Sequence, residues 1–125
     1  MTVTIDGKTL KVEGGGIREN LKPVGTFTDR WIDAVYKKEA KIFGAIRSWT
    51  LRCYEENVPW TSSVAKHLQE KAQSGDAVSF SVDEGNLHEV SATNVYILEV
   101  DIGYPKGSKA SSFIRYFTVK LQEAP

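Results

Sequence analysis

The sequence predicts a mainly β protein with one α-helix (α+β): an antiparallel β-sandwich or split barrel that carries a surface helix at about 57–74. Three observations support this fold class. Short segments in which apolar and polar residues alternate recur along the chain, as in strands with one buried face. Turn-forming residues such as Asp6-Gly7 separate these segments. One segment instead repeats apolar residues every four positions, which is the spacing of a helix.

The first expected element is a β-hairpin within residues 2–12. Its centre is Asp6-Gly7, a pair that favours the positive φ angles of a tight turn. The glycine run 14–16 predicts a break in regular structure. We therefore expect a long loop over 13–26.

Residues 26–44 fit two structures, because their apolar positions match both a helical stripe and a strand-like alternation. The next segment, 45–54, is clearer. Trp49, Leu51 and Cys53 alternate there with polar residues, which predicts a half-buried strand. We expect 26–44 to be a strand as well, because the strand that follows it needs a neighbour.

The helix at about 57–74 has recognisable ends. Pro59 suits its first turn, and Asn57 or a residue of 61–63 can cap its N-terminus. Gly75 provides the C-terminal stop. The stripe expected to face the sheet is Trp60, Val64, Leu68 and Ala72.

The last third of the chain predicts a meander. Strands are expected at 78–82, 87–91, 94–102 and 113–122, with a turn at 83–86 and a polar loop at 104–112. In the strand at 94–102, one face is expected to hold Tyr96, Leu98, Val100 and Ile102. In the strand at 113–122, one face is expected to hold Phe117, Val119 and Leu121. Both strands also carry apolar residues on the opposite face, so the helix, a second sheet or another chain must cover that face.

Composition narrows the function classes. The 125 residues suit one domain, 1–125. Sixteen basic and sixteen acidic residues give zero net charge, which disfavours nucleic acid as a partner. The apolar runs are too short to span a membrane, and the N-terminus has no signal-peptide pattern. We therefore expect synthesis in the cytoplasm and no membrane partner.

We predict no catalytic, cofactor or metal site, no cofactor and no enzymatic activity. His67 and His88 are expected to be solvated, and their spacing with Cys53 matches no zinc or calcium site. Cys53 is expected to be a core residue. The carboxylates in or beside expected strands are assigned to the wet face of the sheet: Asp33, Glu55, Glu56, Glu99 and Asp101.

The order of elements carries a resemblance. An N-terminal hairpin at 3–12 precedes a strand at 47–53, a helix that ends at Gly75, a strand at 78–83 and a closing strand at 114–123. This order resembles that of small β-sandwich or split-barrel proteins of bacteriophage tails and of related tubes and baseplates. The resemblance covers most of the chain and carries over no catalytic or ligand residue.

The resemblance implies a structural subunit of a phage-tail-like or virion assembly, located in the virion. Its partners would be other copies of itself, neighbouring tail or virion proteins, or both, and we expect a homo-oligomer. The contacts would use strand edges and the loops 13–26 and 104–112. The alternative is a small carbohydrate- or protein-binding module that uses exposed aromatic residues: Trp31, Trp60, Tyr104 and Tyr116.

Overall fold

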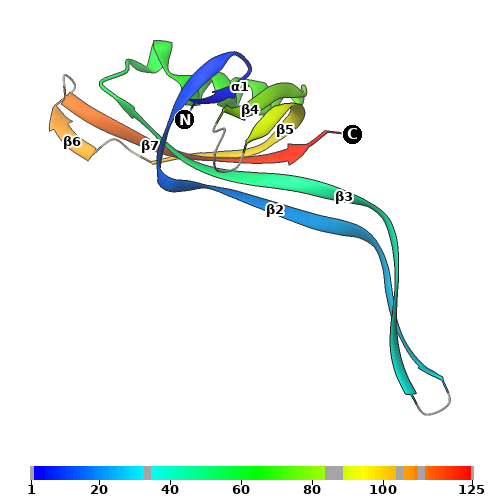
Figure 1. Ribbon diagram of the computed structural model, residues 1–125. Coiled ribbons are helices and arrows are strands. Elements are labelled where there is room, and N and C mark those ends of the chain that lie inside the picture. Colours follow the sequence, from blue (N-terminus) through cyan, green and yellow to red (C-terminus); the bar gives the residue numbers. More distant parts are fainter. Residues whose placement is uncertain (1, 33–34, 84–88, 104–105, 110–111, 125) are drawn as a thin grey trace.

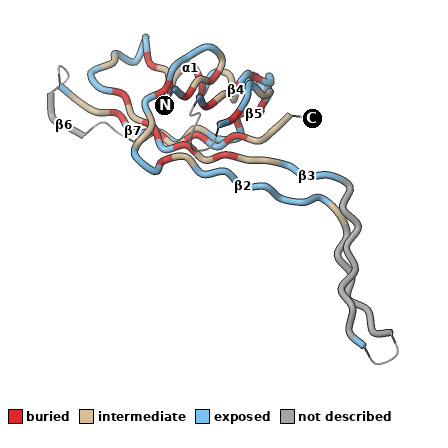
Figure 2. Tube along the Cα trace, in the orientation of Figure 1, coloured by how far each residue is buried: buried red, intermediate tan, exposed pale blue. Residues whose placement is uncertain are grey.

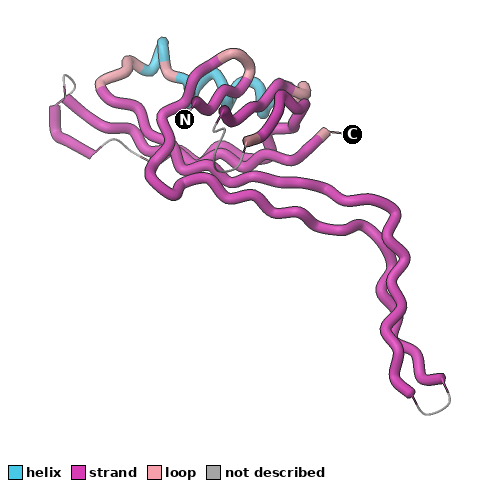
Figure 3. Tube along the Cα trace, viewed as in Figure 1, coloured by secondary structure: helices cyan, strands magenta, loops and turns pink. Residues whose placement is uncertain are grey.

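The computed structural model describes the backbone of residues 2–32, 35–83, 89–103, 106–109 and 112–124; within these, it does not describe the side chains of 26–32, 36–43 and 106–109. The described residues form seven strands, one 3₁₀ turn and one α-helix (Figures 1 and 3). The strands are β1 (Thr2–Ile5), β2 (Lys8–Ile32), β3 (Val35–Glu56), β4 (Val78–Asp83), β5 (Val90–Ile102), β6 (Lys106–Lys109) and β7 (Ser112–Glu123). The helical elements are η1 (Trp60–Ser62) and α1 (Val64–Ser74).

Six of these strands close into an antiparallel β-barrel. They follow the order β3-β2-β1-β4-β5-β7, and pairing of β3 with β7 closes the ring. The short β6 pairs only with β7, outside the barrel. The predicted fold class, mainly β with one α-helix, is confirmed, and the sheet takes the form of a closed barrel.

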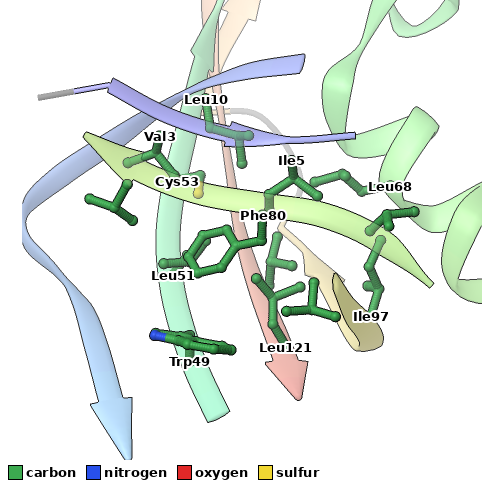
Figure 4. Close-up of a cluster of buried hydrophobic side chains, with 14 of the residues drawn as sticks. Val3, Ile5, Leu10, Trp49, Leu51, Cys53, Leu68, Phe80, Ile97 and Leu121 are labelled. Atoms are coloured by element: carbon green, nitrogen blue, oxygen red, sulfur yellow. The ribbon is translucent and has the colours of Figure 1, made fainter. Parts of the chain in front are cut away.

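The core fills the barrel. Trp49 packs on Phe80 with ring centroids 5.0 Å apart and ring planes inclined at 58° (Figure 4). The predicted inward faces around Trp49 and Phe117 are confirmed by burial. α1 packs against β5 and contributes buried Leu68 and Ala65. Ser63 caps α1, and Gly75 ends it in the left-handed conformation at φ 77°.

Two long strands continue beyond the barrel. β2 and β3 project as a two-stranded ribbon, seen in Figure 1 leaving the barrel and bending partway along its length. We call residues 21–47 the arm, because the described residues of β2 and β3 within this range pair only with each other. At about 3.3 Å per residue, each strand of the arm is about 40 Å long. The expectation of a strand over 26–44 is confirmed for the described residues.

Several expected boundaries are wrong. The glycine run 14–16 and the expected loop 13–26 lie inside β2. Two separate strands were expected at 87–91 and 94–102. The structure instead has one continuous strand, β5, which begins at Val90. The expected loop 104–112 contains β6, while the expected turn 83–86 lies mostly outside the described residues.

Two expected faces also need correction. α1 begins at Val64, so Trp60 precedes the helix and is 43% exposed instead of packing on the sheet. In β5, a register shift between Ile97 and Glu99 changes which side of the strand faces the core. Tyr96 and Leu98 therefore point outward, whereas the later apolar residues of β5 pack on the core.

Candidate interaction site

β2 carries a wide bulge at residues 13–16, and residues 17–20 lie between it and the arm. The register passes from Val12 opposite Cys53 to Ile17 opposite Leu51, so four residues of β2 oppose Arg52 alone. A Cβ atom on Gly16 would lie 2.8 Å from the carbonyl oxygen of Glu13 and 2.9 Å from that of Arg52. The bulge therefore requires glycine at position 16, and beyond it β2 no longer pairs with β1.

A second irregularity divides the arm. Val24 pairs with Gly44 and Gly25 pairs with Ile42, which leaves Phe43 as an extra residue of β3. Because the extra residue lies on β3, the alternation of β2 is uninterrupted from Ile17 to the end of the strand.

This alternation gives the arm two different sides. Ile17 and Glu19 lie opposite Leu51 and Trp49, whose side chains are buried in the barrel. The register places the following odd-numbered residues of β2, with their partners, on that same side. These pairs are Leu21/Arg47, Pro23/Ala45, Gly25/Ile42, Phe27/Ala40, Asp29/Lys38 and Trp31/Tyr36. By register, the continuation of the core-facing side carries mostly apolar residues along the arm, while exposed Val24, Val35 and Ile46 lie on the opposite side.

At the base of the arm, the Nε of Arg47 on this side donates to Glu123 at 2.8 Å, and its guanidinium lies 5.2 Å from the Trp49 ring centroid. Leu21 is 57% exposed there, and Figure 2 shows the described residues of this stretch mainly as exposed. A two-stranded hairpin by itself is marginally stable in water. Beyond Arg47, the described residues of the arm are an extension formed by β2 and β3 alone.

A second exposed apolar surface lies on the outside of the barrel. Leu98, at the bulge of β5, is 57% exposed, and Tyr96 is 39% exposed. We call these two residues the β5 patch. Glu99 and Asp101 beside it are exposed, as the sequence predicted, and Glu99 pairs with Lys120 at 3.2 Å.

Charge is divided unevenly between the arm and the rest of the chain. The arm carries six basic residues and three acidic ones. The remainder carries ten basic and thirteen acidic residues. The net charge of zero is therefore the sum of +3 on the arm and −3 on the rest of the chain, which we call the body.

The structure brings two charged groups together in the interior. Glu55 accepts hydrogen bonds from the Oγ of Ser63 at 2.8 Å, the backbone N–H of Val64 at 2.6 Å and the Nη1 of Arg115 at 2.8 Å. Glu55 is buried, so its expected place on the wet face was wrong. The sequence held a signal for this pair, because Glu55 and Arg115 alternate in step with buried Cys53 and Phe117. Because these donors occupy the carboxylate, we interpret it as an anchor for α1.

Among the residues that the structure describes, the other candidates do not gather into a reactive site. Cys53 is buried, and desolvation raises the pKa of its thiol to about 12, which confirms the core assignment. His67 is half-buried instead of solvated, and its Nε2 lies 2.8 Å from the Oδ2 of Asp6. His88 and Asp33 lie outside the described residues.

The aromatic residues of the alternative prediction are only partly described. Trp60 and Tyr116 are exposed, on η1 and β7, and the guanidinium of Arg115 lies 5.3 Å from the Trp60 ring centroid. Trp49 is buried and cannot contact a ligand. The side chains of Trp31 and Tyr104 lie outside the described residues.

Three clefts lined by described residues hold about 180–200 Å³ each, less than the roughly 300 Å³ at which small-molecule sites usually begin. Within the described part of the chain, no three His, Cys, Asp or Glu side chains form a group that could hold a metal ion. No helix among the described residues is long and apolar enough to cross a membrane. Comparison of the sequence with models of known families and with curated proteins gives no match.

Proposed function

We propose that the chain is a structural subunit of a phage-tail-like or virion assembly, and that it joins copies of itself or neighbouring proteins through the arm. The observation that carries the proposal is the continuation of an apolar sheet face beyond the barrel. Within 21–47, the described residues of β2 and β3 form that extension without any other strand. A partner would supply the layer that the barrel interior supplies to the same face around Trp49.

The remaining features favour a structural role over catalysis. The buried carboxylate of Glu55 is satisfied by donors of the chain itself, and the three clefts are small. Zero net charge limits repulsion between copies that approach closely. The separation of charge between arm and body adds an attraction between different parts of two copies.

The proposal is tested by shortening the arm. Val24 and Gly44 are partners in the ladder, so Asn-Gly can replace residues 25–43 as a tight turn between them. Light scattering over a range of concentrations, with electron microscopy, should show the full chain as rings, tubes or a defined multimer. The shortened chain should remain monomeric, with its barrel intact by circular dichroism.

A milder pair of variants controls for the loss of chain length. Leu21→Ser with Phe27→Ser changes the apolar side and should weaken assembly, whereas Thr26→Ser with Thr28→Ser changes the opposite side and should not. The proposal fails if the full chain is a strict monomer at high concentration. It also fails if the shortened chain assembles as well as the full one.

A further inference from the structure

We infer that the arm of one copy docks with its apolar side on the outer face of the barrel of a second copy, across the β5 patch. This inference rests on the proposed function, in which the arm mediates assembly. It adds the acceptor surface, Tyr96 and Leu98, and identifies the partner as the same chain. Each copy then provides one arm and one acceptor surface.

Charge complementarity is the first reason to name a second copy as the occupant. The arm, 21–47, has a net charge of +3, and the rest of the chain has −3. Asp101 places an acidic group on the outer face of β5 next to the patch, where Glu99 is paired with Lys120. Attraction between an arm and the body of another copy follows from this division and would weaken as salt is added.

The second reason is that two exposed apolar surfaces occur on one chain. Leu98 is 57% exposed, although it is a large apolar residue in the middle of a strand. The bulge in the register turns Leu98 outward beside Tyr96. The apolar side of the arm, continuing from Leu21, offers a surface of the same kind, and burying one against the other removes both from water.

The arm is better suited to docking by its side than by its edge. Lysine and proline on an exposed strand discourage another strand from pairing with it. Lys22 and Pro23 lie on β2, and Lys37, Lys38 and Lys41 lie on β3. By register, positions 22, 37 and 41 belong to the side of the arm opposite the apolar one, so their charge acts on the acidic body of the other copy over a distance and not by direct contact.

Because the donor and acceptor surfaces differ, the contact is heterologous. A heterologous contact repeats from copy to copy and produces a ring if the rotation closes, or an open helical filament if it does not. A two-fold dimer in which two arms pair with each other would not use the β5 patch. The inference therefore predicts which combinations of variants associate.

The test uses two full-length variants and the shortened chain. Leu98→Lys retains the arm but damages the acceptor surface, and the exposure of Leu98 makes this change compatible with folding. The chain with Asn-Gly in place of 25–43 retains the acceptor surface but lacks most of the arm. Ser91→Lys adds the same charge at another exposed position of β5 and serves as the matched control.

In light scattering, Leu98→Lys and the shortened chain should each be monomeric alone. Mixed in equal amounts, they should form a 1:1 complex and stop there, because only one arm and one acceptor surface match. Ser91→Lys should assemble like the unmodified chain. Asp101→Lys, a second acceptor variant, should weaken association at least tenfold, an expected minimum of about 1.4 kcal/mol.

Three results would overturn the inference. If Leu98→Lys and Asp101→Lys both assemble like Ser91→Lys while the shortened chain does not assemble, the arm mediates assembly but the acceptor surface is wrong. If Leu98→Lys forms dimers that the shortened chain cannot join, arms pair with arms. If the unmodified chain never associates, this inference fails together with the proposed function.

Discussion

The Oε2 atom of Glu55 lies 2.8 Å from the Nη1 atom of Arg115, and the two residues are cross-strand partners in the ladder of β3 and β7. Both side chains are buried. Glu55 also binds Ser63 and the backbone N–H of Val64, while Arg115 donates to the carbonyl of Val58. One ion pair thus joins two strands of the barrel to the segment that starts α1.

Replacing either partner should be costly, because the other charge then remains buried without compensation. Arg115→Met or Glu55→Gln is expected to lower the free energy of unfolding by about 3–5 kcal/mol. Urea denaturation measures this loss. The exposed pair of Glu99 and Lys120 provides the control, since Lys120→Met should cost no more than about 1 kcal/mol. Equal small losses at both pairs would contradict a structural role for the buried one.

Local patterns predicted many strands, and pairing between distant segments explains what they missed. Alternation around Trp49 and Phe117 identified the inward faces correctly, because these strands have one side in the barrel. The same alternation in 26–44 predicted a strand but not an arm, because it does not identify which strands lie alongside.

Glycines and charges were harder to interpret. The glycine run 14–16 is compatible with both a loop and a bulge. It forms a bulge because β2 pairs with β3 on both sides of it. No residue near Leu98 signals the register shift that turns it outward. Glu55 and Arg115 could have been found from their alternation with core residues.

Gly16→Ala tests whether the bulge that precedes the arm in β2 needs glycine. The added Cβ would lie closer than 3.0 Å to two backbone oxygens, those of Glu13 and Arg52. We expect a loss of about 1–3 kcal/mol in the free energy of unfolding, measured with guanidinium chloride. Gly14→Ala is the matched control, because nothing lies within 4 Å of its Cβ. Similar losses at both positions would show that chain flexibility, not close contact, decides the effect.

Hydrogen exchange should distinguish the arm from the barrel. In dilute solution, the amides of the arm belong to a two-stranded ladder and are expected to exchange faster than those of β1, β4 and β7, which lie within the barrel. Mass spectrometry of peptides from each region measures the difference. Under assembling conditions, protection of the arm should rise. Strong protection of the arm in the monomer would mean that the ribbon is stable without a partner.

Cys53 reports on the integrity of the barrel through its thiol. Burial is the main cause that raises its pKa from 9.0 to about 12, and the charges of Glu13 and Glu55 add to the effect. Because the folded state holds the proton more tightly, this stabilising contribution is complete below pH 9 and is lost as the pH rises from about 9 towards 12. Relative to Cys53→Ala, the unmodified chain should lose about 1.4 kcal/mol of unfolding free energy between pH 8 and pH 10.

The same thiol should resist alkylation at pH 8 in the folded chain and react at once in denaturant, because the thiolate is the reactive form. Rapid stoichiometric labelling of the native chain would show that the barrel opens at β3. The difference in unfolding free energy between the unmodified chain and Cys53→Ala should, in contrast, be constant between pH 6 and pH 8. A pH-dependent difference in that lower range would place its cause in another group.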